Sequence, residues 1–244
     1  NRMRDFTKYF FLAIIFVSCN GNNTISNNNS IVIDLDSEDF FNQIEKENGV
    51  ILDVRTNEEV VKGSIINASF IDFYDPKFTT KASWIKKDQP VYVYCHGGGR
   101  SAKAAEKLIS LGFSKVYNLV GGYSDWKSSG LPIKSGVDSN PVSYKVYNKP
   151  QIDTILSSNK NTLLVFKTPW CLPCKKLDPV LDVFSKNNES WKVLVVNMDA
   201  NNELAKIYKV NSVPTILAFK KKENFFNHVG FLDLVALEKR TILE

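Results

Sequence analysis

A turn-rich stretch divides the sequence into two parts. Residues 134–141 read Lys-Ser-Gly-Val-Asp-Ser-Asn-Pro, a composition typical of a connection between folded units. On each side of it, short apolar runs alternate with amphipathic segments, which predicts α/β folds. The 244 residues suffice for two domains of ordinary size. Because no internal repeat is visible, we expect two different α/β domains, at 31–135 and 142–244, joined by a linker over 136–141.

The main elements can be placed from the apolar runs. In the first part, the runs at 50–54 and 91–94 predict buried strands, and a helical spacing of apolar residues predicts a helix over 101–111. This alternation favours a largely parallel sheet. In the second part, we expect strands at 163–166, 193–196 and 216–219, and helices that begin near Cys174, Glu203 and Asp233.

The charges and the cysteines narrow the classes of function. The chain carries 31 basic and 26 acidic residues, a net charge of +5, and no stretch concentrates either sign. Nucleic-acid binding would require a basic stripe, so we expect no nucleic-acid partner. Four cysteines are too few for a disulfide scaffold. One lies near the N-terminus, one lies alone in mid-chain and two form a close pair, which points to separate roles.

The N-terminal segment has the pattern of an export signal. Basic residues precede an apolar run over 9–17, which is followed by Ser18 and Cys19. The run is shorter than the roughly 20 residues that a membrane-spanning helix needs. A basic start, a short apolar centre and a small residue are typical of a secretory signal. We therefore predict a signal peptide over 1–18, a flexible polar tether over 19–30, and a mature protein in the periplasm or cell envelope.

The small residue before Cys19 also resembles the lipobox of bacterial lipoproteins. That resemblance implies that Cys19 is lipidated and becomes the first residue of the mature chain, so that the protein is anchored to a membrane. An ordinary signal peptide and an uncleaved anchor remain the alternatives.

The lone mid-chain cysteine lies in an unusual loop. An apolar strand is followed by Cys95, His96, Gly97, Gly98, Gly99, Arg100 and Ser101, and then by a helix. Glycines allow successive backbone N–H groups to point inward as an anion-binding nest, and a helix N-terminus adds positive potential. Both effects would stabilise a thiolate. The alternative is a buried cysteine that acts as a small apolar residue beside a flexible turn.

The residues around this loop resemble the rhodanese family over roughly 31–135. The resemblance rests on four separated blocks in the same order: Asp53-Val54-Arg55-Thr56 with Glu58-Glu59, Gly63-x-Ile65-x-x-Ala68, the loop itself, and Gly121-Gly122-Tyr123-x-x-Trp126 with Gly130-Leu131-Pro132. Four residues separate Cys95 from Arg100, as in sulfur-transferring members, whereas phosphatase relatives carry one more.

The resemblance implies roles for the loop residues. Cys95 would take a sulfane sulfur from a donor and hold it as a persulfide, while the amides from His96 to Ser101 cradle the anion. Arg100 would orient either the donor or the loop, and His96 would either assist proton transfer or face solvent. For Asp53, Arg55 and Glu59 we expect structural ion pairs.

The cysteine pair lies between a strand and a helix. Trp170-Cys171-Leu172-Pro173-Cys174 places Cys171 at a helix N-terminus, which favours its thiolate, and Cys174 can resolve a mixed disulfide. A zinc half-site would need two further ligands, and the remaining histidines and cysteines are scattered, so we expect no metal site. A structural disulfide remains the other alternative.

The wider residues of the second part resemble the thioredoxin fold over about 142–244. Trp170, Pro173 and a later Pro179 surround the pair, and Val213-Pro214-Thr215 precedes a predicted strand. The resemblance implies that Pro214 is a cis-proline that packs against the disulfide and leaves a backbone edge for a partner peptide. Two positions depart from the family: Val165 replaces a buried acid and Val195 replaces its lysine partner.

Together the two resemblances imply a rhodanese-type sulfurtransferase joined to a thioredoxin-like thiol–disulfide oxidoreductase. In a coupled cycle, Cys95 would accept sulfur, Cys171 would attack the persulfide, and Cys174 would close the disulfide and release reduced sulfur. The expected partners are a sulfane-sulfur donor or another small sulfur species, a thiol–disulfide partner protein such as a membrane electron donor, and a membrane reached through the lipid anchor. No cofactor is expected.

Two alternatives to this function remain open. One is a general extracytoplasmic disulfide reductase whose rhodanese-like module senses sulfur species or is non-catalytic. The other is an anchored interaction module with a structural disulfide.

Overall fold

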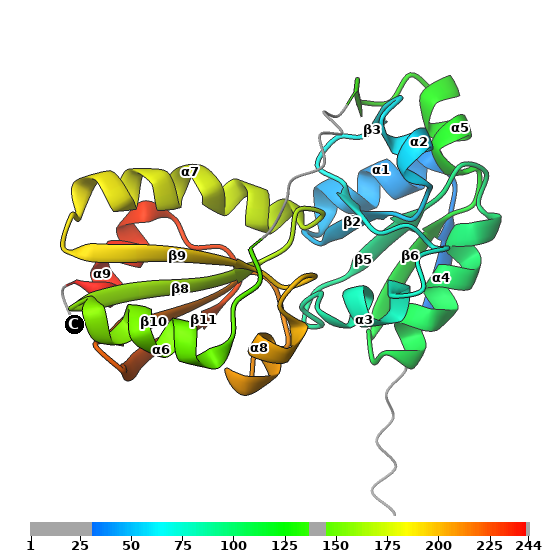
Figure 1. The fold of residues 1–244 in the computed structure, drawn as a ribbon. Coiled ribbons are helices and arrows are strands. Elements are labelled where there is room, and N and C mark those ends of the chain that lie inside the picture. Colours follow the sequence, from blue (N-terminus) through cyan, green and yellow to red (C-terminus); the bar gives the residue numbers. More distant parts are fainter. Residues whose placement is uncertain (1–30, 137–144, 243–244) are drawn as a thin grey trace, which may run out of the picture.

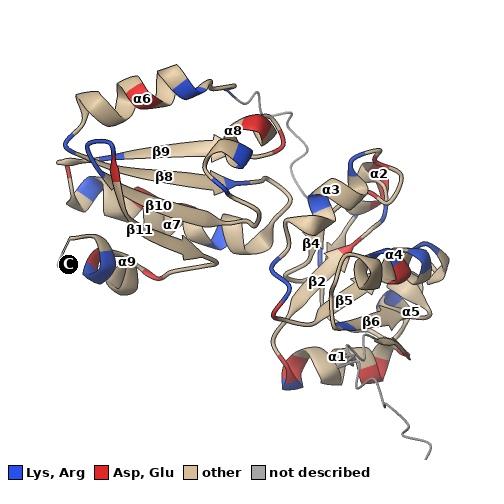
Figure 2. Cartoon of the chain, turned by 90° about the horizontal axis from the view of Figure 1, so that it is seen from below, with Lys and Arg blue, Asp and Glu red and all other residues tan. Residues whose placement is uncertain are grey.

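The computed structural model describes residues 31–136 and 145–242, which form two α/β domains (Figure 1). The predicted signal peptide, the lipidated Cys19 and the tether lie outside the described residues, as does most of the predicted linker. No helix in the described ranges is long and apolar enough to cross a membrane. Basic and acidic residues are distributed over both domains (Figure 2).

The first domain is built on a five-stranded sheet in which all pairings are parallel. From one edge to the other, its strands are β1 (Ile31–Leu35), β6 (Lys115–Leu119), β5 (Val91–Tyr94), β2 (Val50–Asp53) and β4 (Ser69–Phe70). Every residue of β2 and β5 is buried, which explains why β5 and the first three residues of β2 are apolar runs in the sequence. Because β4 is the last strand, one of its backbone edges has no partner strand within this domain.

Helices cover both faces of this sheet. The helices are α1 (Ser37–Lys46), α2 (Asn57–Val60), α3 (Phe78–Ser83), α4 (Gly99–Ser110) and α5 (Gly122–Ser128). Along β5, Tyr92 and Tyr94 join the hydrophobic cluster that contains residues of α1 and α5, whereas Val91 and Val93 join the cluster that contains residues of α3 and α4. This alternation is the two-residue period of a strand buried on both faces. A short antiparallel pair, β3 (Ser64–Ile65) with β7 (Ile133–Lys134), ties the end of the domain to its middle.

The second domain has a four-stranded mixed sheet. The strand order is β11 (Glu223–Val229), β10 (Thr215–Lys220), β8 (Asn161–Lys167) and β9 (Trp191–Asn197), with β8 and β9 parallel and the other pairings antiparallel. The helices are α6 (Lys149–Ser158), α7 (Leu172–Asn187), α8 (Asn202–Ile207) and α9 (Leu234–Thr241). Residues of α7 and α9 form one hydrophobic cluster with β8, and residues of α6 and α8 pack on its other face.

The elements expected from the sequence are present with small shifts. The strand predicted at 91–94 is confirmed, and the helices predicted near Glu203 and Asp233 begin at Asn202 and Leu234. The helix expected over 101–111 begins two residues earlier, at Gly99. The shift arises because Gly98 adopts φ +92°, so the chain turns into the helix directly after it.

The two domains are in contact where β4 and the end of α3 in the first domain meet the loops after β8 and before β10 in the second. A single hydrophobic cluster runs through both and includes Trp84 from the first domain and Trp170 from the second. A cavity of about 970 Å³ lies beside this contact and is lined by residues of both domains, among them Ser69 and Leu172. The loop that carries the cysteine pair therefore lies at the domain boundary.

Candidate active sites

The first candidate site is the loop that follows β5. Cys95 comes directly after the strand, and its Sγ accepts hydrogen bonds from the N–H of Gly98 at 3.1 Å and from the hydroxyl of Ser101 at 3.5 Å. The Cys95 residue is only 2% exposed. The loop thus holds the sulfur at the carboxyl end of the central strand, where α4 begins.

Hydrogen bonds determine the ionisation of this thiol. Burial opposes formation of the thiolate, but the hydroxyl and the amide of Ser101, together with the amides of Gly97 and Arg100, outweigh burial and lower the pKa of Cys95. Of the six loop amides expected to cradle an anion, those of Gly97, Gly98, Arg100 and Ser101 are directed at the sulfur, while binding of a substrate anion stays a prediction. A thiolate in this position is both a nucleophile and an anion that the backbone stabilises.

Only one of the three loop glycines is fixed by its surroundings. Gly98 has φ +92°, and a Cβ placed on it would collide with the carbonyl of Val120. Gly122, at the start of α5, also lies close to the loop: it has φ +62°, and a Cβ placed on it would collide with the carbonyl of His96. Gly97 and Gly99 face open space. The close contact between the loop and the turn before α5 therefore depends on Gly98 and Gly122.

The expected ion pairs are present. The Arg55 guanidinium hydrogen-bonds the Asp53 carboxylate, with Nη2 and Oδ2 2.6 Å apart, and both side chains are buried. Arg100 donates from two nitrogens to the two oxygens of Glu59, each at 2.7 Å. This pairing lowers the pKa of Glu59 to about 2. The geometry joins Arg100 to α2 and so fixes the start of α4, while contact of Arg100 with a donor stays a prediction.

His96 lies on the solvent side of the loop. Its carbonyl accepts a hydrogen bond from the N–H of Ser124 at 3.0 Å, and its side chain is exposed. In the described part of the chain, the imidazole makes no hydrogen bond to the protein.

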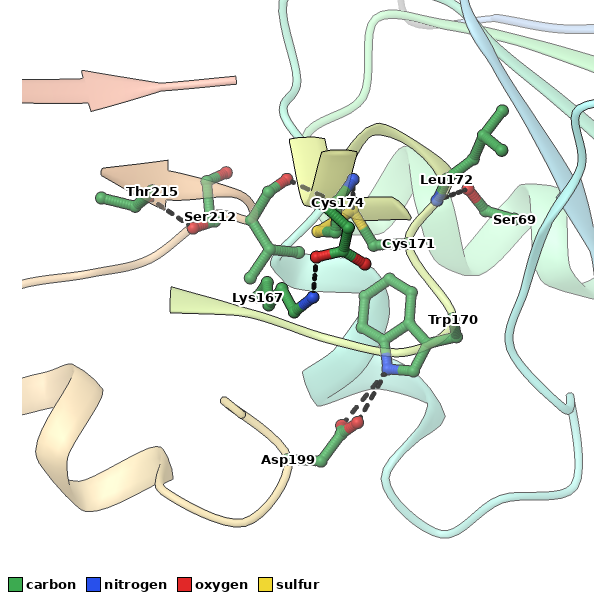
Figure 3. Close-up of a disulfide and its surroundings, with 11 residues drawn as sticks. Ser69, Lys167, Trp170, Cys171, Leu172, Cys174, Asp199, Ser212 and Thr215 are labelled. Atoms are coloured by element: carbon green, nitrogen blue, oxygen red, sulfur yellow. Dashed lines mark hydrogen bonds and ion pairs between the residues drawn. A yellow bond between two sulfur atoms is a disulfide. The ribbon is translucent and has the colours of Figure 1, made fainter. Parts of the chain in front are cut away.

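The second candidate site is the cysteine pair at the start of α7 (Figure 3). Cys171 and Cys174 form a disulfide. Cys171 caps the helix, and its Sγ accepts a hydrogen bond from the N–H of Cys174 at 3.2 Å. Pro173 lies in the first turn of the helix. Backbone N–H groups in this turn have no partner within the helix, so proline, which has no N–H, is tolerated there.

The residues predicted to support the pair lie around it. The Val213–Pro214 bond is cis, as predicted, and the Cys171 Sγ lies 3.8 Å from the carbonyl oxygen of Val213. The indole N–H of Trp170 donates to both carboxylate oxygens of Asp199, at 3.1 and 3.3 Å. Figure 3 shows Trp170 and Asp199 directed toward one another below the disulfide.

Comparisons with known proteins match each part of the chain to a different family. The rhodanese-like domain family matches residues 36–129, and the thioredoxin family matches residues 143–241. A sulfurtransferase from Allochromatium vinosum is 34% identical over 104 residues, which cover 42% of this chain and 95% of that protein. A thioredoxin from Mycoplasmoides gallisepticum is 31% identical over 87 residues, which cover 36% of this chain and 87% of that protein.

The chain belongs to both families. Its first domain is a rhodanese-like domain and its second is a thioredoxin domain. Among solved structures, a rhodanese-like domain protein from Staphylococcus aureus is 34% identical, with a TM-score of 0.37, and the match covers 42% of this chain and 99% of that one.

The thioredoxin domain differs from its family beneath the disulfide. Val165 is fully buried in β8, so an apolar side chain occupies the position of the usual acid, and Val195 on β9 is exposed. An ion pair between Lys167, at the end of β8, and Asp178, one turn after Cys174 in α7, lies near this position.

Sequence reasoning missed three residues at the thioredoxin site. Asp199 receives the Trp170 indole, and its pKa is raised mainly by burial. It lies two residues after β9, at the same sheet end as the disulfide, so strand order was a usable signal for it. Ser69 and Trp84 come from the rhodanese-like domain, and no motif in the sequence pointed to them.

Proposed function

We propose that the chain transfers sulfane sulfur at Cys95 and exchanges thiols and disulfides at Cys171 and Cys174. The proposal rests on one arrangement that both sites share. Cys95 and Cys171 each lie between a strand and a helix, and the Sγ of each accepts a hydrogen bond from the N–H of the residue three positions later. The distances are 3.1 Å from Gly98 to Cys95 and 3.2 Å from Cys174 to Cys171. Amide donors at a helix N-terminus stabilise a thiolate, which is the reactive form in both chemistries.

The sulfur-transfer step takes place at Cys95. Its thiolate attacks the sulfane sulfur of a donor such as thiosulfate, the donor's S–S bond breaks, and sulfite leaves with the electron pair. Cys95 then carries a persulfide anion. The lowered pKa of Cys95 supports this role, and the amides of the loop are placed to stabilise the negative charge of the product.

The disulfide-exchange step takes place at the start of α7. In the reduced form, the Cys171 thiolate attacks a partner disulfide and forms a mixed disulfide. Cys174 then attacks Cys171, which releases the partner as a dithiol and closes the pair. An external dithiol reductant must restore the reduced form before the next cycle.

In a coupled cycle, the persulfide itself would be the substrate of the dithiol. The Cys171 thiolate attacks the outer sulfur of the protonated Cys95 persulfide, and the Cys95 thiolate leaves. Cys174 loses its proton to solvent, attacks Cys171, closes the disulfide and expels hydrosulfide. The dithiol loses two electrons and the transferred sulfur gains them, so the step balances.

One observation favours the uncoupled alternative, a disulfide reductase with a sulfur-binding module. Hydrogen bonds join the Cys171 loop to Ser69 and Phe70 of the rhodanese-like domain, and in the described residues none joins it to the Cys95 loop. The coupled cycle would need direct contact between the Cys171 loop and the Cys95 loop. We also propose, from the N-terminal pattern alone, that the protein is exported and anchored through a lipid on Cys19.

Intact mass spectrometry tests sulfur transfer. A full chain with Cys19→Ser is incubated with thiosulfate or polysulfide, and we expect a mass increase of one sulfur atom. Cys95→Ser should lose this adduct, and Cys171→Ser should retain it. Failure of every donor to add sulfur to the parent protein would contradict the proposed transfer.

A small disulfide tests the exchange site. The reduced protein is mixed with 5,5′-dithiobis(2-nitrobenzoic acid), and release of the coloured thiolate is followed in single turnover. We expect Cys171→Ser to abolish the fast phase while Cys95→Ser keeps it. Equal fast phases in the Cys171→Ser variant and the parent would make the pair structural.

A further inference from the structure

The rhodanese-like domain occupies the backbone groups that surround the disulfide. The N–H of Val213, the residue before the cis-proline, donates to the carbonyl of Trp84 at 3.0 Å. On the other side of the disulfide, the carbonyl of Trp170 accepts the N–H of Phe70 at 3.1 Å. Both bonds are made between backbones, as an added strand or an extended peptide would make them.

Side-chain contacts reinforce these bonds. The N–H of Leu172, the residue after Cys171, donates to the hydroxyl of Ser69 at 3.0 Å, a contact visible in Figure 3. The indole rings of Trp84 and Trp170 stack with centroids 6.4 Å apart and planes 12° apart. Cys171 is left only 4% exposed.

Charge complementarity also crosses the boundary. The ammonium of Lys81 lies 4.0 Å from the carboxylate of Asp199, the same carboxylate that accepts the Trp170 indole N–H. Lys81 is held in turn by Asp75 at 2.7 Å within its own domain. The first domain thus contacts the disulfide loop through backbone, aromatic and charged groups.

From these contacts we infer that the rhodanese-like domain is an internal occupant of the polypeptide-binding edge of the thioredoxin domain. The Val213 N–H cannot serve Trp84 and a partner chain at the same time. A protein partner must therefore displace the Trp84 segment before its sulfur reaches Cys171, whereas a small disulfide needs only the Cys171 sulfur. The kinetic consequence of this inference rests on the proposed exchange activity. The occupation of the edge is independent of that activity.

Hydrogen–deuterium exchange tests the occupation directly. In the oxidised full chain, we expect the amides of Phe70 and Val213 to be protected, although they lie in different domains. Trp84→Ala should weaken both protections together, because the two amides depend on one interface. Wild-type amides that exchange as fast as those of an unstructured peptide would overturn the inference.

Kinetics test whether the Trp84 segment limits access of protein partners to Cys171, an effect called gating below. For each variant, the rate of insulin reduction is divided by the rate with 5,5′-dithiobis(2-nitrobenzoic acid), so that a general change in thiol reactivity cancels. We expect Trp84→Ala to raise this ratio by about tenfold, because the partner-competent fraction sets the apparent rate. An unchanged ratio, in a variant whose amide protection has fallen, would overturn the gating.

A milder pair of variants covers the case in which Trp84→Ala does not fold. Lys81→Ala removes the ion pair to Asp199 and should raise the same ratio by about twofold. Lys86→Ala is the matched control, because Lys86 pairs with Asp88 of its own domain, and its ratio should equal that of the wild type. If no form reduces either disulfide, the proposed exchange activity fails, and amide exchange in Lys81→Ala still decides whether the edge is occupied.

Discussion

Arg100 and Glu59 face each other with two hydrogen bonds of 2.7 Å, although they lie 41 positions apart in the sequence. Arg100 is the second residue of α4 and Glu59 lies in α2, so the pair fixes the end of the Cys95 loop to the neighbouring helix. Among the described residues the guanidinium pairs with Glu59, and the Ser101 hydroxyl and the loop amides are left as the anion donors around Cys95.

Replacement of Glu59 should loosen this loop. Glu59→Gln leaves Arg100 without its carboxylate, and we expect the free energy of unfolding to fall by about 1 kcal/mol, the upper range for a partly exposed pair. Formation of the Cys95 persulfide should also slow by severalfold. Denaturant unfolding and the mass assay measure the two effects. Glu106→Gln, at an exposed position of α4, is the control and should match the wild type.

The same pair predicts a pH dependence. The pKa of Glu59 falls from 4.5 to about 2 in the folded protein, so the folded state binds fewer protons than the unfolded state between these values. The stabilisation is therefore complete above pH 4.5 and is lost as the pH falls toward 2. The difference in unfolding free energy between wild type and Glu59→Gln should shrink over that window. A difference independent of pH would contradict the assignment.

The thiol of Cys95 should ionise below its ordinary pKa of 9.0. In the oxidised protein with Cys19→Ser, Cys95 is the one free cysteine, so the pH profile of its alkylation by iodoacetamide gives the value. Ser101→Ala removes the largest contribution that favours the thiolate, and the midpoint should move to higher pH. Ser110→Ala, at the far end of the same helix, should leave the midpoint unchanged.

The loop glycines should differ in their tolerance of alanine. Gly98→Ala places a side chain at positive φ and against the Val120 carbonyl, and should lower the unfolding free energy by about 1–3 kcal/mol. Gly97→Ala meets open space and should change stability by less than about 0.5 kcal/mol. Thermal denaturation of the two variants compares them directly. Equal losses would mean that the loop does not keep this backbone conformation.

Much of the fold and of both sites was accessible from the sequence. The strand β5, which is buried on both faces, is a continuous apolar run. The loop after β5 was recognisable as a thiolate site from Cys95 and the glycines around Gly98. These signals are local, because strand burial, turn chemistry and helix capping act over a few residues. The resemblance of each domain to a different family was visible in several such local sequence motifs.

The parts that escaped prediction depend on contacts between distant residues. The partner of Arg100 lies on another helix, and the contact of Trp84 with Trp170 joins two domains across 86 positions. Such contacts are set by how complete elements pack, and a single sequence contains no periodic pattern for them. Ser69 and Trp84, which contact the disulfide loop from the other domain, could be recognised only in the folded structure.

The hydrogen bond from Phe70 to Trp170 also has a consequence for solubility. β4 is an edge strand, and the Phe70 N–H belongs to the side that faces away from β2. Unpaired strand edges are templates on which other chains add and aggregate. By accepting this N–H, the thioredoxin domain shields the edge of its neighbour. Separation of the domains would therefore expose the Cys171 sulfur and the free edge of β4 at the same moment.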